Sequence, residues 1–550
     1  MAAHGRQGGC GSPGCGRAQA PGITRRQFMA GASAATWGGL ALLAAGCPHP
    51  PDEEAELWLR FAHITDAHIT DEESPARTVR LDPLLPFSHW RPHEAYAAQV
   101  LDATLSVVNA RHAERPLDFL VHTGDAIDLD QYNELRWFLD IFDGKWVVPD
   151  SGEPDGEERP VPPELNPKLG FQARGLDRGI PWYALHGNHD GLAMGNFRVN
   201  THAPSPRHWI APLLRPIARL IGLHAFPDRP NYLWPLDARS PTVIVGSEEP
   251  PMHPDTLQLC AGELEAGPIV PDEDRRFLTR HGVIEEHFHT ETAPRGHGFT
   301  EANREQGHAY YSARPREDVP LRLIVLDTVS PAPIPGFPFF YGVLPREQFE
   351  DFLKPEVEAA RAAGEHVLIM SHHPSIEFAA PHPSATVGTQ AFRRYLASQP
   401  HVLAHCCGHH HRHHVTTVWG RYPYPEIQTA SLIDYPQEGR LIEIYHYPES
   451  GGFRIDGAML SHMEAPTPLS AESFRRAKIA SEQQWLKVAQ EPSADGALPD
   501  TAAILEQLGL PEELANSLPE SPFALEPGPY PPEAIKGGIG DREFSIELNR

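Results

Sequence analysis

Five short segments of the chain place aspartate, asparagine or histidine directly after an apolar run. In chain order they are Ile64-Thr65-Asp66-Ala67-His68, Thr123-Gly124-Asp125, Gly187-Asn188-His189-Asp190, Ser371-His372-His373-Pro374 and Gly408-His409-His410-His411. Each segment alone is weak evidence, because polar residues are common in turns that follow strands. Imidazole and carboxylate ligands suit Zn, Mn or Fe, whereas an all-oxygen set would indicate Mg or Ca. Taken together, the five segments predict a hydrolytic metal centre.

Asp125 is the candidate for joining two metal ions. Two divalent cations held roughly 3.5 to 4 Å apart need a shared ligand, and the two oxygens of a carboxylate can bridge them. The i, i+2 spacing of Asp66 and His68 at a strand end would put both side chains on one side, where both can reach one ion. His409 and His411 repeat this spacing. We therefore expect two divalent ions as cofactors, with Mn, Fe and Zn open as alternatives.

The five segments resemble the signature of the calcineurin-like metallophosphoesterase family, which reads Asp-x-His, Gly-Asp-x-x-Asp, Gly-Asn-His-Asp/Glu, a lone His and Gly-His-x-His. All five blocks occur in this order, and the resemblance spans residues 59 to 445 with long insertions. It implies that one metal ion is held by Asp66, His68, Asp125 and His411. It implies that a second ion is held by Asp125, Asn188, His372 and His409, with His372 favoured over its neighbour His373.

The resemblance also implies catalytic roles for Asn188, His189 and Asp128. In relatives the histidine and the aspartate form a pair beside the metals. A carboxylate that accepts a hydrogen bond from one ring nitrogen fixes the tautomer and supports the imidazolium form. His189 could then stabilise phosphoryl charge or protonate the leaving oxygen, and Asp190 would be a supporting or structural residue. Purple acid phosphatases carry Tyr at the position of Asp128, so that subgroup is disfavoured.

The implied activity is hydrolysis of phosphate mono- or diesters by in-line attack of a hydroxide that bridges the metals. Arg304, Arg412 and Asn133 are polar residues that could contact a phosphate. One alternative is a catalytically degenerate relative that only binds a metal or another ligand, although this chain keeps every ligand. Another alternative is a metal-sequestering protein that binds metal through its histidine-rich segments, such as residues 406–414.

Net charge narrows the class of partner. The formal net charge of -27 over 550 residues repels nucleic acid and anionic membrane surfaces at long range. Bound metals would still provide a local positive field, so a small phosphate ester is the expected substrate. Nucleic acid is therefore an unfavoured partner, and the oligomeric state stays open.

Residues 1–47 resemble a twin-arginine export signal, with Thr24-Arg25-Arg26-Gln27-Phe28-Met29 before an Ala-, Gly- and Leu-rich stretch. That stretch is marginal for spanning a bilayer, which favours a cleaved signal. Leu43-Ala44-Ala45-Gly46-Cys47 is similar to a lipoprotein processing site, so a lipid anchor at Cys47 is the one expected membrane contact. We expect a periplasmic or cell-envelope protein. Its mature part keeps Cys260, Cys406 and Cys407, which are too few for a disulfide scaffold.

Apolar periodicity predicts a layered α/β core with the motifs on loops at strand ends. The predicted strands are 57–64, 117–123, 182–186, 308–313, 321–327, 366–371, 414–419, 424–430 and 440–446, with the last three in one second sheet. The predicted helices are 94–111, 133–142, 344–363 and 470–490. The family resemblance implies a four-layer αββα sandwich with long insertions.

The expected organisation is a signal over 1–47, a tether over 48–58, a catalytic domain over 59–463 and a tail over 464–550. The Pro-, Gly- and acid-rich stretch 147–178 indicates an irregular excursion. Residues 191–305 form an insertion directly after the Asn188 loop, so we expect a substrate cap, with a surface decoration as the alternative. The tail is expected to be part helical and part irregular, without chemistry. We interpret His413 and His414 as solvated loop histidines.

Overall fold

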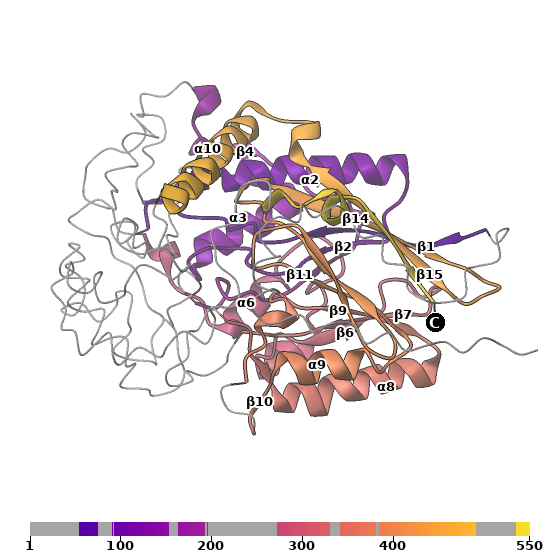
Figure 1. The fold of residues 1–550 in the computed structure, drawn as a ribbon. Coiled ribbons are helices and arrows are strands. Elements are labelled where there is room, and N and C mark those ends of the chain that lie inside the picture. Colours follow the sequence, from indigo (N-terminus) through magenta and orange to yellow (C-terminus); the bar gives the residue numbers. More distant parts are fainter. Residues whose placement is uncertain are drawn as a thin grey trace, which may run out of the picture. The chain divides into compact units, whose positions relative to one another are not determined.

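The protein is represented by a computed structural model that describes residues 54–74, 91, 93–152, 163–192, 195, 272–329, 341–380, 384–490 and 535–549. The core of this part consists of two six-stranded sheets (Figure 1). The predicted signal, the tether up to residue 53, Cys47, Cys260 and most of the predicted 191–305 insertion lie outside the described residues.

The first sheet has the order β16-β15-β14-β1-β2-β5. Its strands are β1 (Glu56–Ile64), β2 (Phe119–His122), β5 (Trp182–Ala184), β14 (Glu438–His446), β15 (Phe453–Ser461) and β16 (Phe544–Leu548). The strands β1, β2 and β5 are parallel, and β14, β15 and β16 continue the sheet in antiparallel fashion. The carboxyl ends of the three parallel strands therefore lie at one edge of this sheet.

The second sheet has the order β12-β13-β11-β9-β7-β6. Its strands are β6 (Tyr311–Ala313), β7 (Leu321–Val325), β9 (His366–Met370), β11 (Val402–Cys407), β12 (His414–Val418) and β13 (Tyr424–Gln428). The four inner strands are parallel, and the outer two pair antiparallel. Here too, the carboxyl ends of the parallel strands meet at one edge.

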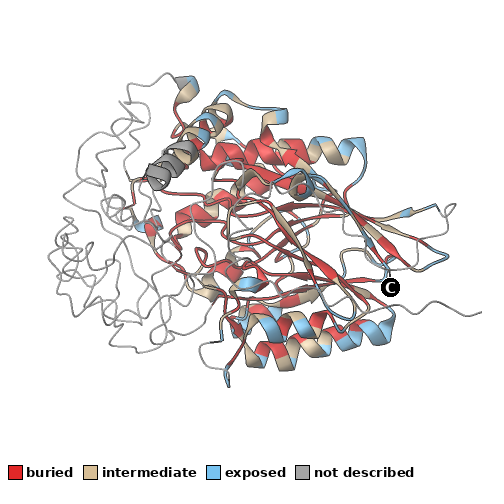
Figure 2. Ribbon diagram, viewed as in Figure 1, coloured by how far each residue is buried: buried red, intermediate tan, exposed pale blue. Residues whose placement is uncertain are grey.

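Helices cover the outer face of each sheet (Figure 1). The helices α2 (Ala97–Glu114) and α3 (Tyr132–Asp143) pack on the first sheet, and α10 (Pro468–Gln490) packs on α2. The helices α8 (Lys354–Ala363) and α9 (Thr389–Leu396) lie beside the second sheet. On α2, α3, α8 and α9 the inward faces are buried and the outward faces are more exposed (Figure 2). This arrangement confirms the predicted four-layer αββα sandwich.

Several short elements connect these layers. They are η2 (Glu94–Tyr96), β3 (Trp146–Val147), η3 (Pro163–Leu165), β4 (Phe171–Gln172), η4 (Glu273–Arg275), α6 (Arg280–Glu286), α7 (Glu301–Gln306), β8 (Leu344–Pro345), η5 (Gln348–Leu353), η6 (Ser375–Glu377), β10 (Thr386–Val387), η7 (His462–Glu464) and α13 (Ile539–Arg542). Among the described residues no helix is both long and apolar enough to cross a membrane.

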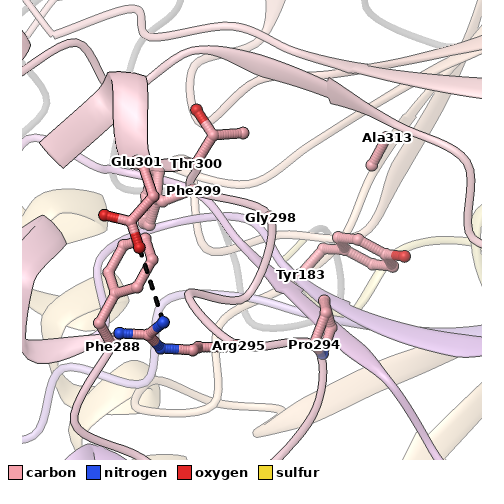
Figure 3. Close-up of a pocket in the computed structure, with 9 residues that line it drawn as sticks. All are labelled: Tyr183, Phe288, Pro294, Arg295, Gly298, Phe299, Thr300, Glu301 and Ala313. Atoms are coloured by element: carbon pink, nitrogen blue, oxygen red, sulfur yellow. Dashed lines mark ion pairs between the residues drawn. The ribbon is translucent and has the colours of Figure 1, made fainter.

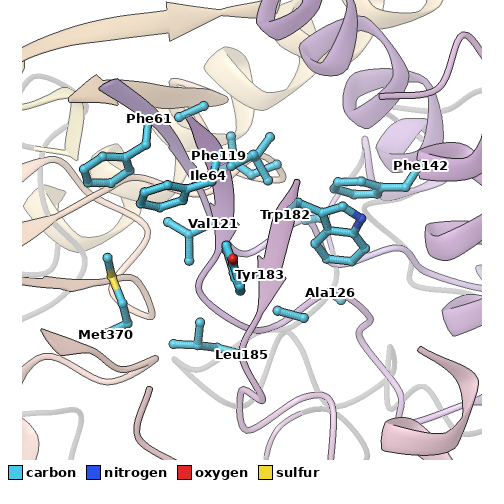
Figure 4. Close-up of a cluster of buried hydrophobic side chains, with 14 of the residues drawn as sticks. Phe61, Ile64, Phe119, Val121, Ala126, Phe142, Trp182, Tyr183, Leu185 and Met370 are labelled. Atoms are coloured by element: carbon cyan, nitrogen blue, oxygen red, sulfur yellow. The ribbon is translucent and has the colours of Figure 1, made fainter. Parts of the chain in front are cut away.

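Alternating residues of the second sheet contribute to two different hydrophobic cores. Leu368 and Met370 pack in the main core with residues of the first sheet, whereas Val367 and Ile369 pack in a second core beneath α8 and α9. Figure 4 shows Met370 in the main cluster near Phe61 and Phe119, whose rings stack at 4.6 Å between centroids. A strand buried on both faces needs a continuous apolar run, which explains why β9 reads as one.

Two sequence predictions about the elements were wrong in detail. The strand predicted at 440–446 does not join the second sheet, because β14 pairs with β1 in the first. The helix predicted from residue 344 begins later, since Leu344–Pro345 pairs with Thr386–Val387 as a short strand. The predicted strands also leave out β11, β15 and β16. Apolar alternation identifies a strand but does not specify its partner, and that partner is set by the tertiary packing.

The described end of the 191–305 insertion is anchored beside the first metal motif. The fully buried Arg275 places Nε 3.0 Å from Asp71 Oδ2 and donates through Nη2 to Ser151 Oγ at 2.6 Å. Asp71 lies three residues after His68. Separating a buried ion pair leaves an uncompensated charge, which is strongly destabilising. This contact therefore holds the last part of the insertion against the core. The role of a cap stays a prediction.

Glu426 of β13 generates a prediction about acid stability. Its carboxylate lies 2.9 Å from His405 Nδ1 and 3.0 Å from Arg393 Nη2. Burial would raise the pKa of Glu426, but the hydrogen bond and charge of His405 and the charge of Arg393 lower it to about 2. A carboxyl group with a lowered pKa stabilises the fold above its ordinary pKa, and that stabilisation is lost as the pH falls through the folded value.

We therefore expect metal-free protein to lose roughly 3 kcal/mol of unfolding free energy as this group protonates. The loss should occur between pH 4.5, the ordinary value, and about pH 2. Denaturant titrations at a series of pH values should show Glu426→Gln to be less stable at neutral pH and less sensitive to acid. Glu358→Gln, at a half-exposed position on α8, is the matched control. Equal acid sensitivity of Glu426→Gln and wild type would contradict the assignment.

Candidate metal centre

The predicted metal ligands lie on loops that follow the parallel strands of both sheets. Asp66 and His68 follow β1, Asp125 follows β2, and Asn188 follows β5. His372 follows β9, while His409 and His411 follow β11. Because parallel strands end together, each sheet brings its own ligands to one edge, and the sandwich sets the two edges side by side.

Five of these residues have left-handed backbone conformations, with φ between 43° and 71°; they are Asp66, His68, Asp125, His409 and His411. Such a conformation costs on the order of 1 to 3 kcal/mol for a residue other than glycine and persists only where surrounding contacts enforce it. Asp66 N donates to Gly124 O and His68 N to Asp125 O, both at 3.0 Å. These hydrogen bonds join the loops after β1 and β2.

The expected reason for the i, i+2 spacing was wrong. Strand β1 ends at Ile64 and β11 at Cys407, so the two ligand pairs lie in left-handed turns beyond the strands. Asp66 and His68 do reach the same cluster, but His409 and His411 contribute to different clusters. The turn, rather than strand alternation, directs these side chains.

The first cluster gathers Asp66, His68 and His411. His68 Nε2 lies 3.1 Å from His411 Nε2 and 3.8 Å from Asp66 Oδ1. His411 Nε2 lies 3.3 Å from Asp66 Oδ1. Asp66 and His68 are buried, and His411 is slightly exposed, so this cluster has limited access to solvent.

The second cluster gathers Asn188, His372 and His409. His372 Nε2 lies 2.9 Å from Asn188 Oδ1 and 3.2 Å from His409 Nδ1. Asn188 Nδ2 donates to Gly195 O at 3.3 Å, which directs the amide oxygen into the cluster. His373 also has a ring nitrogen near His372 and His409, but its Nδ1 lies 2.8 Å from Thr328 Oγ1. The choice of His372 as the ligand stays a prediction.

Asp125 lies between the two clusters. Its Oδ2 is 3.1 Å from His372 Nε2 and 3.6 Å from His68 Nε2, and its Oδ1 accepts a hydrogen bond from His189 N at 2.8 Å. Burial would raise the pKa of Asp125, but His372 and His189 hold it well below the usual range. A Cβ on Gly187 would lie 2.2 Å from Asp125 Oδ1, so glycine is required for this close approach.

The protons of three histidines point away from the clusters. The Nδ1 atoms of His68, His411 and His372 face Asp128 Oδ1 at 2.7 Å, Asp434 Oδ2 at 2.6 Å and Thr123 O at 2.9 Å. In the neutral tautomer that these acceptors select, each Nε2 presents a lone pair to the other acceptor atoms. Asp66 Oδ1 has no hydrogen-bond donor within the described part of the chain. Buried acceptors that converge in this way are stabilised by a cation between them, which is either a proton on a histidine ring or a metal ion.

The separations fit divalent metal ions as well. Ligand atoms roughly 2.0 to 2.2 Å from a metal lie roughly 3 Å from one another, which is the spacing in both clusters. Burial would lower the pKa of His372, but the charges of Asp125 and Asp66 raise it to about 10. Burial would likewise lower the pKa of His411, but the carboxylates of Asp66 and Asp434 raise it to about 9. Both clusters thus attract positive charge.

The residues predicted beside the metals lie together. His189 Nδ1 is 3.1 Å from Asp128 Oδ1, and the same oxygen faces His68 Nδ1. Asp128 therefore supports a predicted metal ligand as well as His189. Asp190 accepts hydrogen bonds from the backbone N–H groups of Asp125, Ala126 and Gly187, each at 2.8 Å. It organises the turn after β2, which fits the structural role expected from the sequence.

Sequence reasoning missed two supporting carboxylates. Asp434 lies 2.6 Å from His411 Nδ1 and 3.0 Å from Arg91 Nε. Glu377 lies 3.1 Å from His409 Nε2 and 2.5 Å from His410 Nε2. Neither carboxylate belongs to the five motifs. Asp434 follows the short apolar pair Leu432-Ile433 and Glu377 follows a single isoleucine, and acidic residues in such positions are frequent.

One residue interpretation was wrong, and several other side chains can now be placed. His413 is buried and lies 3.0 Å from Arg440 Nη2, so it is not a solvated loop histidine, whereas His414 is half-exposed. Two of the residues considered for phosphate contact are paired elsewhere, Arg304 with Glu285 and Asn133 with Asp71. Cys406 and Cys407 are buried free thiols.

Figure 3 shows a cavity of about 410 Å³ beside Tyr183 of β5. Tyr183, Phe288 and Phe299 line it, and Arg295 and Glu301 form an ion pair at 3.6 Å beside it. None of the predicted metal ligands lines this cavity. It is therefore a separate feature from the site of the expected chemistry.

Comparison with known proteins supports the class of the site. Residues 59–253 match the Calcineurin-like phosphoesterase family, a region that contains Asp66, His68, Asp125 and Asn188. No curated protein matches the chain. Among solved structures, a dimetal phosphatase from Danio rerio is 13% identical, with a TM-score of 0.34, and the match covers 74% of this chain and 100% of that chain. At that TM-score the similarity carries no information about activity.

The contact of Asp434 with His411 generates a selective prediction. Removing a carboxylate that orients a metal-bound histidine typically weakens metal affinity by roughly 10- to 100-fold. We expect Asp434→Ala to lower the metal affinity of the first cluster by this factor and to change the affinity of the second cluster much less. Chelator competition with two resolved affinities measures this, and Asp456→Ala on β15 is the control. An equal effect on both ions, or on neither, would argue against the assignment.

Proposed function

We propose that this protein is a metal-dependent phosphoesterase that hydrolyses phosphate mono- or diesters. The observation that carries the proposal is the position of Asp125 Oδ2 between two clusters of convergent acceptor atoms. The family match over residues 59–253 supports the same class of reaction. The described side chains keep the complete predicted ligand set, which argues against a degenerate relative.

The residues suited to hold two divalent ions, with Mn, Fe and Zn as alternatives, form two sets that share Asp125. The first set is Asp66, His68, Asp125 and His411, and the second is Asp125, Asn188, His372 and His409. When bound, the two ions would polarise the phosphoryl group, neutralise its charge and acidify water. The left-handed turns and the carboxylates behind the histidines hold these side chains in place before substrate arrives.

His189 is the residue best suited to act on the substrate. Burial would lower its pKa, but the charge of Asp125 and the hydrogen bond to Asp128 raise it. Its backbone N–H and its Nδ1 are both fixed by aspartates, so the ring has a defined orientation. We infer that His189 stabilises negative charge on the phosphoryl group or delivers a proton to the leaving oxygen, and that Asp128 orients it.

The proposed substrate is a small phosphate ester. The net charge of -27 disfavours nucleic acid at long range, whereas a local dinuclear centre would attract a small anion. Monoester and diester substrates are both compatible with this centre. Turnover of paired chromogenic mono- and diesters, with metal content measured on the same sample, decides between them.

Replacing the shared carboxylate is the direct test of this function. We expect Asp125→Asn to lower turnover by at least about a thousandfold and to reduce bound metal, because one ligand serves both ions. Asp318→Asn, at an exposed position, controls for the loss of an aspartate. Metal content and turnover are measured on the same preparation. Full activity in Asp125→Asn would sink the proposal.

We also propose that the protein is exported by the twin-arginine route to the periplasm or cell envelope. Arg25 and Arg26 precede an apolar stretch, and this route carries folded proteins, which suits an enzyme that acquires metal before export. We expect Arg25→Lys/Arg26→Lys to hold the protein in the cytoplasm, measured by cell fractionation. Arg17→Lys is the control, and normal export of the double variant would refute this route. A mature chain lipidated at Cys47 and an unlipidated one stay open as alternatives after cleavage of the signal.

A further inference from the structure

The C-terminal segment reaches the loop that carries His409 and His411. We call residues 535–542 the clamp. His413 N donates to Ile535 O at 3.0 Å, and Val415 N donates to Asp541 Oδ1 at 2.9 Å. A Cβ on Gly537 would lie 2.9 Å from His413 O, so the two backbones approach closely. The clamp therefore binds the chain immediately after the predicted ligand His411.

Arg440 of β14 connects the clamp to both ends of this loop. Its side chain is fully buried, and Nη1 donates to Asp541 O at 2.7 Å and to Arg542 O at 3.3 Å. Its Nη2 lies 3.0 Å from His413 Nδ1 and donates to Gln428 O at 3.2 Å. Gln428 Nε2 in turn donates to Gly408 O at 2.9 Å. A buried guanidinium needs acceptors for its N–H groups, and the clamp supplies two of them.

Two further contacts hold the clamp in position. Arg542 Nη2 lies 2.8 Å from Glu438 Oε1, and Glu438 Oε2 lies 3.5 Å from His413 Nε2. The strand β16, yellow in Figure 1, follows the clamp and pairs with β15 along the edge of the first sheet. The clamp thus joins that sheet to the start of β12, which is the edge strand of the second.

The contact of Val415 N with Asp541 Oδ1 caps the edge strand β12. A cap for that edge alone would not need the contact of His413 N with Ile535 O, which lies in the loop two residues after His411. His409 and His411 have φ of 71° and 54°, and such conformations persist only where the surroundings enforce them. Release of the loop at this end would let both residues relax, and each serves a different cluster.

We propose that the clamp and Arg440 are positioning elements of the metal centre, which hold His409 and His411 in their ligating orientation. The inference rests on the two metal sites of the proposed function. The segment predicted to lack a chemical role is then required for metal affinity. Because His409 and His411 belong to different clusters, loss of the clamp lowers the metal affinity of both clusters. Loss of Asp434, in contrast, lowers the affinity of the first cluster.

The test is a metal titration of full-length variants. Asp541→Ala/Arg542→Ala removes the side-chain contacts of the clamp. Ser545→Ala/Glu547→Gln is the matched control, because these β16 residues bond to Asp456 and Tyr447 and not to the metal loop. The titrant is Mn²⁺ or Zn²⁺, and two equivalents are expected to bind. We expect the affinity for each of the two equivalents to fall at least tenfold in the clamp variant and less than twofold in the control. The metal-free forms should have similar melting temperatures.

A conservative variant separates positioning from general destabilisation. Asp541→Asn keeps an oxygen that can accept from Val415 N, so it should recover most of the affinity that Asp541→Ala loses. This single pair carries the test if the double variant does not fold. Unchanged affinity in the clamp variants, with two ions bound to wild type, overturns this inference alone. Failure of wild type to bind two ions overturns the proposed function as well.

Discussion

The site depends on a cluster of buried acceptor atoms that face one another without donors. Asp125 stands at its centre, with Asp66 on one side and Asn188 on the other, and the histidine lone pairs complete it. Each of three histidines turns its ring proton outward to an aspartate or a backbone carbonyl. Buried negative charge of this kind is costly unless a cation compensates it. The fold therefore holds buried negative charge that two metal ions can neutralise.

The two-sheet sandwich holds the ligands of this arrangement in place. Parallel strands of two sheets end at adjoining edges, so ligands separated by more than 300 positions, such as Asp66 and His411, come within 3.3 Å. Left-handed turns then direct the ligands, and backbone hydrogen bonds between the loops hold those turns. Glycine at position 187 allows the carboxylate of Asp125 to lie directly against the backbone. Strain at the loops is thus compensated by the rigid core beneath them.

The sequence was informative where chemistry and local spacing coincide. Asp66, His68, Asp125 and Asn188 stand in short motifs after apolar runs, and the fold class followed from the order of those motifs. It was uninformative where a role depends on tertiary contact alone. Asp434, Glu377 and Arg440 are single polar residues with no local pattern, and His413 looked like its exposed neighbour although Arg440 and Glu438 enclose it. The pairing of β14 with β1 is likewise set by packing, because alternation does not identify a partner strand.

The most direct measurement of the central claim is anomalous diffraction from crystals of the metal-loaded protein, recorded on both sides of the metal absorption edge. The account predicts two anomalous peaks, roughly 3.5 to 4 Å apart, on either side of the Asp125 carboxylate. One peak should be flanked by His68 and His411, and the other by His372 and His409. A single peak, or peaks located away from Asp125, would contradict it.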